Sequence, residues 1–463
     1  MNLLLLAIAF RVWSGTAVSA FLRLMAAIAL FSLEMQVATW WQLGTLRSLR
    51  LVNVGIAAAG VLWHAHWRAR GRRAHTPGRA DDVESPLALP DRRPRLPPVS
   101  GILALTAIVT ALALLRPVTG ADPYHLHRVD QITARGTLAY DPAAPDIKVN
   151  ALAGVYELLL ADLRIPGMAT AFVRLHGVLG LGFYLVSVAA AARWIPLRRR
   201  WPLLIFLVVP VIFHQFVLVK NDLFGALPAF VALAWVVARG SRMSVGDVAA
   251  AAALAGFAVG VKISSAPLAI VVALFVIADH HKWRPIGAAL GAGLAGAVAG
   301  GLLFTLAANH AVYGGAVGPY VSLGNRHESV GSALIGVGRF AMSLIDLGTV
   351  TPRVWPGRGG WGSTFGLPLV WALVVLACRR GDRTAQRALI AGAGGFIAFA
   401  ASYPDADIAH RLVVAPGLLM ILVAVGLVDR EDRQSAWLRH ALIPVLALSA
   451  LQVARSAVLY LQR

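Results

Sequence analysis

The sequence predicts an all-α protein, a polytopic bundle of transmembrane helices. Of its 463 residues, 58% are hydrophobic and only 14% are charged, and the mean hydropathy is +0.70. Soluble domains of ordinary composition are less apolar and contain more charged residues. Apolar runs recur along the whole chain without a long soluble interruption, which favours one polytopic unit over a series of soluble domains.

The apolar runs define about 11–13 predicted spans, because a helix needs about 20 mostly apolar residues to cross a bilayer. The two runs on either side of Lys262 form either a tight helical hairpin or one kinked helix. Short amphipathic helices are expected in the extracytoplasmic loops, and residues 150–164 have the pattern of one. The apolar runs lie near residues 21–41, 50–64, 101–117, 169–192, 202–219, 223–238, 247–261, 264–278, 285–308, 364–378, 388–403, 410–428 and 439–460.

The excess of basic residues predicts the orientation in the membrane. The formal net charge is +20, and arginine supplies most of the positive charge. Because the basic residues lie in short segments between apolar runs, the positive-inside rule explains them, and nucleic acid is not an expected partner. The abundance of alanine, glycine and arginine suggests a bacterial source, so we expect a multi-pass protein of the bacterial plasma (inner) membrane. The basic segments are 68–98, 193–200, 239–242, 280–284, 378–383 and 429–439.

The same alternation divides the chain into parts. We expect an N-terminal membrane hairpin over 1–64, with the apolar N-terminal stretch retained, a basic cytoplasmic linker over 65–98 and a transmembrane domain over 99–463. The extracytoplasmic side then receives the outer loops 118–168 and 309–363 and two short segments, 219–222 and 403–411. These segments are rich in Asp, His, Tyr, Asn and Trp. The active side is therefore expected to be extracytoplasmic.

The stretch "GADPYHLHRV" is the first group of ionisable residues on that side. If the chain becomes helical after Pro123, Asp122, His125 and Asp130 are expected to share a face that points toward the bundle. A carboxylate at Asp122 has two roles open to it. It is a good helix cap, since it precedes a proline at the first helical position, and it is also a candidate general base.

Cations near the same side form the second group. Lys220, Asn221 and Asp222 lie between two apolar runs, where polar residues are needed simply to make the turn, and where a lysine can also meet a lipid phosphate. Lys262 lies within a long apolar stretch, so a carboxylate or a phosphate partner is expected. Arg411 begins a late helix from the extracytoplasmic side.

Metal and thiol chemistry have weak sequence support. No His and acid spacing typical of a zinc site occurs near Asp122, and the pair Asp405 and Asp407 is a short pattern that a solvated loop explains equally well. We therefore expect no metal and no cofactor, with a divalent metal as the alternative. Cys378 is the single cysteine, so the chain has no internal disulfide.

Four stretches in order resemble the polytopic GT-C-type glycosyltransferases, in particular the bacterial relatives of protein O-mannosyltransferases and aminoarabinose transferases. "ADPYHLHRV" is similar to the family's first outer-loop motif, and "LVKNDLFGALPAF" to its K-N-D turn. "AGFAVGVKISSAPLAI" resembles its G-x-K-x-(S/T) segment, and "AHRLVVAPGLLMI" its late R-(Y/F)-L-x-x-P helix start. The resemblance covers roughly residues 101–428. Departures include His127 in place of a proline and the absence of an aromatic residue after Arg411.

The resemblance implies an enzyme, a glycosyltransferase with a polyprenyl-phosphate sugar as donor and a glycan, lipid or protein hydroxyl as acceptor. It implies that Asp122 is the catalytic base of an inverting single displacement. Lys220, Lys262 and Arg411 are then expected to bind the donor phosphate and stabilise it as it leaves. Candidate substrate-binding residues are Tyr124, His125, Arg128, Asp130, Asn221 and Asp222.

Two functions from other classes remain as alternatives. The first is a transporter or flippase of an anionic lipid-linked or envelope precursor, for which an intramembrane lysine and interrupted helices are suitable. The second is a non-catalytic partner in cell-envelope assembly. The polar groups gather on one side of the predicted membrane and no inverted repeat is visible, and both observations favour the enzyme.

Overall fold

The computed structural model describes residues 2–10, 17–74, 96–115, 123–141, 144, 154–163, 176–217, 221–318, 329–345, 365–402, 413–430 and 433–461. Within these ranges every regular element is a helix, as the all-α prediction requires. The helices of the first half are α1 (Asn2–Ala9), α2 (Ala17–Trp40), α3 (Ser48–Ala74), α4 (Val99–Leu115), α5 (Pro123–Arg135), α7 (Val155–Leu163), α9 (His176–Ala192), the 3-10 helix η1 (Trp201–Leu207) and α10 (Pro210–Val217).

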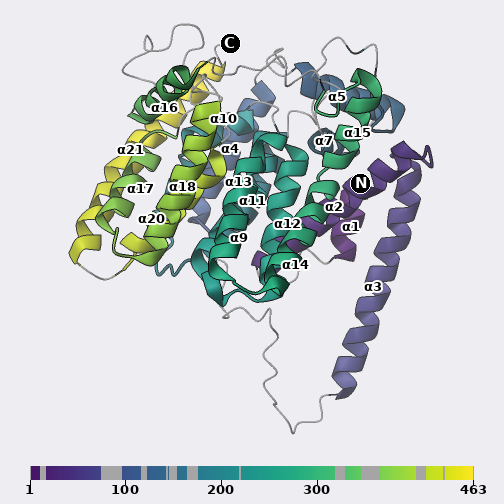
Figure 1. Cartoon of the computed structure of the whole chain (residues 1–463), viewed down its shortest axis with the longest axis horizontal. Helices are drawn as coiled ribbons and strands as arrows, with labels where there is room; N and C mark the ends of the chain where they lie inside the picture. The colour runs from purple at the N-terminus through teal and green to yellow at the C-terminus, as the bar shows by residue number, and fades with distance from the viewer. Residues whose placement is uncertain are drawn as a thin grey trace.

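The second half of the chain continues the same pattern. Two 3-10 turns, η2 (Gly240–Arg242) and η3 (Ile263–Ser265), lie between its longer helices. The helices are α11 (Asp222–Arg239), α12 (Val245–Val261), α13 (Ala266–Asp279), α14 (Trp283–Ala299), α15 (Leu302–Tyr313), α16 (Val330–Ile345), α17 (Leu367–Cys378), α18 (Arg383–Ser402), α20 (Val414–Val428) and α21 (Arg433–Leu461). Figure 1 shows most of them running side by side as a bundle.

Several of these helices are long and apolar enough to cross a membrane. By length and composition the described part contains four, within α2, α3, α11 and α21, and a fifth if the bent pair α14 and α15 is one span. Further apolar helices of 10–17 residues accompany them, among them α4, α9, α12, α13, α17 and α20.

Helix α11 forms the centre of the bundle. It is buried along almost its whole length, from Asp222 to Val237, and it packs against α9, α12 and α20. A helix that is apolar on every side is stable only when other helices cover it all round, and α11 meets that condition. Its position matters for function, because it joins the two ends of the bundle, with Asp222 at one end and Arg239 at the other.

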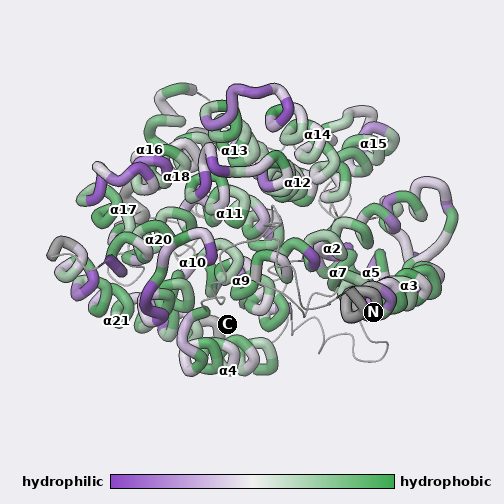
Figure 2. Tube along the Cα trace, turned by 90° about the horizontal axis from the view of Figure 1, so that it is seen from below, coloured by the Kyte–Doolittle hydropathy of each residue, from purple (hydrophilic) through white to green (hydrophobic). Residues whose placement is uncertain are grey.

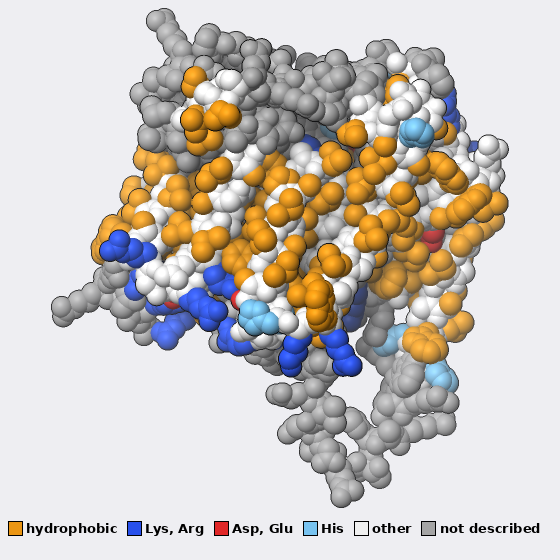
Figure 3. All heavy atoms as spheres, viewed as in Figure 1, with side chains coloured by type: hydrophobic (Ala, Val, Ile, Leu, Met, Phe, Trp, Pro, Cys, Tyr) orange, Lys and Arg blue, Asp and Glu red, His pale blue; other side chains and the backbone are white. Residues whose placement is uncertain are grey.

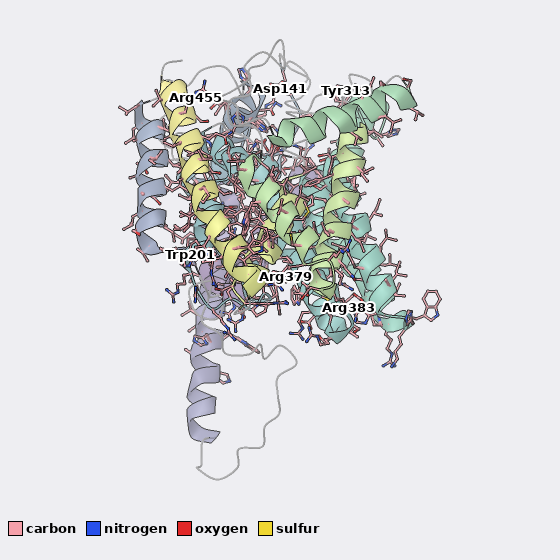
Figure 4. All side chains as sticks on the ribbon, turned by 90° about the vertical axis from the view of Figure 1, so that its left-hand side faces the viewer. Asp141, Trp201, Tyr313, Arg379, Arg383 and Arg455 are labelled. Carbon is pink, nitrogen blue, oxygen red and sulfur yellow. The ribbon has the colours of Figure 1, made fainter. Side chains whose placement is uncertain are left out.

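Basic loops gather at one end of the bundle, which we call the basic end: residues 193–200, 239–244, 280–282, 379–382 and 429–430. Arg430 pairs with Asp382 at 2.7 Å and so joins two of these loops, while Arg387 of α18 donates to the backbone carbonyl of Val236 of α11 at 2.8 Å beside them. Figure 3 shows Lys and Arg along this lower rim, below a broad apolar belt, and Figure 2 views the same end, where hydrophilic segments link the apolar helices. Arg379 and Arg383 lie there in Figure 4.

The other end, which we call the opposite end, contains α5, α7 and α15 and the start of α11. Asp141 and Tyr313 lie there in Figure 4, where α16 crosses the bundle transversely. Exposed apolar side chains of α16 include Val330 and Leu334, whose i, i+4 spacing places them on one face of the helix. Short amphipathic helices were expected in the predicted outer loops, and α16 falls within the predicted loop 309–363.

Helices α12 and α13 form an antiparallel hairpin, which decides between the two arrangements expected around Lys262. Asp279, at the far end of α13, binds Arg387 at the basic end, close to the start of α12. Lys262 therefore lies at the turn, at the opposite end. Small residues let α12 approach α14 closely, since a Cβ atom on Gly256 or Gly296 would overlap a facing backbone carbonyl.

Two predicted spans are interrupted. The run 202–219 is the 3-10 helix η1 followed by the short α10, because Pro210 starts a new helix and Val208 leaves the helical conformation. The run 285–308 is the pair α14 and α15, bent by 54° at Gly300 and Gly301. Gly301 has a φ of 96°, a conformation that favours glycine.

The N-terminal helices pack onto the rest of the bundle. Helix α1 contacts α2, α3 and α7, and α2 contacts α9 and α14. Helix α3 continues to Ala74, ten residues past the expected end of the hairpin at 64, and extends below the basic end (Figure 1). Residues 75–95 of the predicted linker lie outside the described residues, and the division into 1–64, 65–98 and 99–463 stays a prediction.

Candidate functional site

An ion pair between Lys262 and Asp222 is the first feature of the opposite end. Nζ of Lys262 contacts Oδ1 of Asp222, whose side chain is buried, while the lysine side chain keeps 27% of its surface exposed. Asp222 is the first residue of α11, and Lys262 directly follows α12. A negative charge at a helix N-terminus and a positive charge at a C-terminus both gain from the helix dipole. Of the two partners expected for Lys262, the structure shows the carboxylate.

The backbone brings Lys262 out of its helix. Its φ and ψ of −151° and 106° are extended, and the 3-10 turn η3 follows before α13 begins with a proline in its first turn. Gly225 of α11 faces this turn, and a Cβ atom there would lie 3.4 Å from the Cβ of Lys262. The absence of a side chain at Gly225 leaves room for the lysine stem beside α11.

A buried pair between His125 and Glu157 is the second feature. Nδ1 of His125 on α5 is hydrogen-bonded to Oε1 of Glu157 on α7, and both residues are buried. Glu157 is not among the site residues predicted from the sequence, where it was only a polar interruption of an amphipathic helix. Its signal was an acid between Tyr156 and three leucines, since an acid among apolar residues at a membrane surface needs a partner.

Aromatic rings connect the two pairs. The ring of Tyr156 lies edge-on to His125 at 6.2 Å and 5.8 Å from Phe224, measured between ring centroids. Phe224 follows Asp222 by two residues and lies 6.0 Å from Phe257 on α12. The Lys262–Asp222 and His125–Glu157 pairs therefore belong to one region, in which α5, α7, α11 and α12 meet through a layer of aromatic side chains.

Arg128 is buried, and its described contacts hold the chain after α5. Its terminal nitrogens donate to the carbonyls of Leu138 at 2.6 Å and Ala139 at 3.2 Å, and it lies over the ring of Tyr140 at 5.4 Å. Burial lowers the pKa of Arg128, while Tyr140 and Glu157 oppose that shift. These contacts fold the segment 136–141 back onto α5, and the prediction that Arg128 binds substrate stays a prediction.

That folded segment is tied to α15. The hydroxyl of Tyr140 donates to Oδ1 of Asn309 at 3.2 Å. Burial raises the pKa of Tyr140, which keeps its hydroxyl protonated as a donor at neutral pH. Residues of the first and the third predicted outer segments thus meet at the opposite end.

The expected shared face of α5 is wrong for Asp130. His125, Arg128 and Val129 are buried, whereas Asp130 is exposed. Five residues at about 100° each turn Asp130 roughly 140° away from His125 around the helix, so only one of them points into the bundle. Asp130 therefore faces away from the region formed by the two ion pairs.

The remaining predicted residues have varied outcomes. Asn221 is buried just before α11, and its backbone carbonyl accepts from Gly225 at 3.1 Å while its side chain makes no capping bond. Tyr124 lies in the first turn of α5, and its side chain is not described. Asp122, Lys220 and Arg411 lie outside the described residues, as does the pair Asp405 and Asp407.

Helix α7 differs from the amphipathic interfacial helix expected over 150–164. It extends from Val155 to Leu163, and it is buried from Glu157 to Asp162 because α1 covers one side and α5 another. Asp162 accepts hydrogen bonds from the backbone amides of Asn2 and Leu3, at 3.1 and 3.0 Å, and so caps the N-terminus of α1. Both acids of α7 thus have partners inside the protein.

The described residues include no cluster of three or more His, Cys, Asp or Glu side chains able to hold a metal ion. We compared the chain with protein-family models, with curated proteins and with solved structures, and none of them matched.

Proposed function

We propose that the protein is a membrane glycosyltransferase that moves a sugar from a polyprenyl-phosphate donor to an acceptor hydroxyl at the opposite end. The Lys262–Asp222 pair is the observation that supports it most directly. The lysine ammonium has three N–H donors, one of which Asp222 occupies, and its side chain is partly exposed. A phosphate at this position would find a cation already oriented by a buried carboxylate.

The membrane placement in this proposal follows from charge. The basic end is cytoplasmic, as the positive-inside rule requires, and the opposite end is extracytoplasmic. The apolar helices cross the membrane several times, and the exposed apolar belt in Figure 3 faces the acyl chains. The bacterial plasma membrane is the proposed location, and polyprenyl lipids of its outer leaflet then reach the opposite end by lateral diffusion.

The proposed chemistry is a single displacement. Asp122, which directly precedes α5, takes the proton of the acceptor hydroxyl, and that oxygen attacks the anomeric carbon as the bond to the lipid phosphate breaks. The anomeric configuration inverts, and the phosphate leaves with its negative charge stabilised by Lys262, Lys220 and Arg411. The acceptor is a glycan, a lipid or a protein hydroxyl. No cofactor is required for these steps.

The location of the charges favours an enzyme over a transporter or flippase. Transporters bind substrate near the membrane midplane, at interrupted helices. Here Asp222 begins α11 and Lys262 follows α12, so the pair lies at helix ends. His125 and Glu157 lie at the same end, in line with chemistry at one membrane surface.

The test uses the protein reconstituted in liposomes with a panel of radiolabelled polyprenyl-phosphate sugars. Release of polyprenyl phosphate and labelling of added acceptors measure transfer, and binding of the unlabelled donor is measured separately. Asp122→Asn is expected to lower the rate of transfer at least about 100-fold while donor binding persists, since general base catalysis contributes about 10²–10⁴-fold to the rate. Asp382→Asn, the same change at the basic end, serves as control. Unchanged transfer by Asp122→Asn removes Asp122 as the base.

A further inference from the structure

Helix α7 carries two buried carboxylates, each of which binds a different neighbouring helix. Glu157 is hydrogen-bonded to His125 of α5, whereas Asp162 caps the N-terminus of α1. The helix has nine residues, too few for stability on its own, so contacts with its neighbours fix its place. Each carboxylate is thus a separate, specific link between α7 and one other helix.

The link to α5 is the stronger constraint on the catalytic region. Glu157 has a side-chain exposure of 4% and His125 of 0%, and burying a carboxylate is favourable only when donors or cations surround it. Nδ1 of His125 supplies the hydrogen bond, and Glu157 also attracts the guanidinium of Arg128 one turn further along α5. One hydrogen-bonding side chain and one cation of α5 therefore act on the same carboxylate of α7, the first by direct contact and the second through its charge.

The geometry fixes the first turn of α5 in particular. His125 is the third residue of the helix, and Tyr156 packs edge-on against its ring. The hydrogen bond to Glu157 fixes the orientation of the imidazole ring, and the contact with Tyr156 fixes how closely α5 packs against α7. Asp122 stands three positions before His125 in the chain, directly before the first residue of α5.

We propose that Glu157 is a positioning residue that acts through His125 to hold the start of α5, the helix that follows Asp122 in the chain, in the place needed for transfer. This inference rests on the proposed glycosyltransferase function for its consequence in catalysis. Its structural half, that Glu157 holds α5 in place, is independent of any activity and is measurable by itself.

The structural half is tested by a distance measurement in liposomes. In a Cys378→Ser background, spin labels at His127→Cys on α5 and Ile270→Cys on α13 report the separation of the two helices, since both native side chains are solvent- or lipid-exposed. Glu157→Gln is expected to broaden or shift the distance distribution. Asp162→Asn is the matched control, because it removes the other buried charge of the same helix but loosens α1 instead. An unchanged distribution in Glu157→Gln overturns the proposal.

A second variant keeps the test valid if Glu157→Gln folds poorly. His125→Phe with Glu157→Leu replaces the pair by apolar side chains of similar size and leaves no buried charge without a partner, an exchange that proteins often tolerate. The double variant is expected to remain folded, yet to lose the directional bond and broaden the distribution. A wild-type distribution in this folded double variant also overturns the proposal.

The catalytic half is tested by separating kcat from donor KM. Small misplacements of a reacting group cost up to about 100-fold in rate, so Glu157→Gln is expected to lower kcat about 10–100-fold with little change in the KM for the donor. A rise in KM alone, with kcat unchanged, contradicts a positioning role. If the spin-label distances change and wild-type protein transfers none of the donor sugars, the proposed function fails while the link between Glu157 and α5 stands.

Discussion

Arg387 at the start of α18 binds both carboxylate oxygens of Asp279 at the end of α13, at 2.8 and 2.6 Å. Its guanidinium also lies over the ring of Phe275 at 4.5 Å and donates to the backbone carbonyl of Val236. One side chain therefore fastens α11, α13 and α18 together at the basic end. Bidentate pairing of this kind is specific to arginine.

Arg387→Met is expected to lower the stability of the protein markedly. The pair is largely buried, with side-chain exposures of 11% and 6%, so removing one partner leaves a buried carboxylate without its cation and costs about 3 kcal/mol. Thermal unfolding in detergent measures the effect. The exposed neighbour Arg383, changed to Met, is the control and is expected to differ little from wild type. Equal melting temperatures for the two variants contradict this account.

Close packing of α12 on α14 is expected to control the position of Lys262. Gly296→Leu places a side chain where the backbone of α12 passes, so the helices must separate and both stability and donor binding fall. Gly291→Ala is the control, because no atom lies within 4 Å of a Cβ there. Alanine in place of a helical glycine is expected to stabilise the folded protein by about 0.5–1 kcal/mol. Unfolding temperature and retention of donor report the outcome. A tolerated Gly296→Leu contradicts the tight contact.

Lys262→Met is expected to weaken donor binding by more than it lowers protein abundance. The substitution removes a cation from buried Asp222 as well as from the proposed phosphate site, so some loss of stability accompanies it. The double variant Lys262→Met with Asp222→Asn separates the two effects, since it no longer buries an acid. It is expected to recover abundance without recovering donor binding. Recovery of both indicates that the pair is purely structural.

Acid is expected to weaken the basic end through Asp382. Burial alone would raise the pKa of Asp382, but hydrogen bonds from Arg430 and from the backbone amides of Ala385 and Thr384 bring it below the ordinary 3.8. The unfolded chain therefore takes up the proton first as the pH falls, and the stabilisation present above pH 3.8 is lost below it. Arg430 is exposed to solvent, so the pair contributes at most about 1 kcal/mol to the free energy of unfolding. In Asp382→Asn, the melting temperature is expected to fall less steeply with decreasing pH below pH 4 than in wild type. The same pH dependence of the melting temperature in both proteins contradicts the assignment.

Hydrophobic patterning was sufficient to predict most of the described helices, but it did not predict α16, and it failed where the backbone breaks. The run 223–238 became α11 nearly residue for residue, because an uninterrupted apolar stretch has no other stable form in a bundle. The run 202–219 was wrong as one span, although Pro210 is visible in the sequence. Proline is tolerated within other helices here, such as α11 at Pro228, so its presence alone does not mark a break.

The candidate site was only partly predictable. Asp222 and Lys262, which are 40 positions apart, were both named from the sequence, yet their direct contact depends on the hairpin at η3. Glu157 was missed because its partner His125 lies on another helix, and pairing across helices leaves no periodic pattern. Asp130 was misplaced because the five-residue spacing from His125 does not return to the same side of a helix.

Asp162 caps α1 from a distance of 160 positions along the chain. During synthesis on the ribosome, the helix over residues 2–9 therefore cannot acquire its buried cap until residue 162 has been added. Until then its first amide groups must remain with water or with the insertion machinery. The cap of α1 is completed only when the predicted first outer loop is made, so a chain that ends before residue 162 is expected to show faster hydrogen exchange at the first amides of α1.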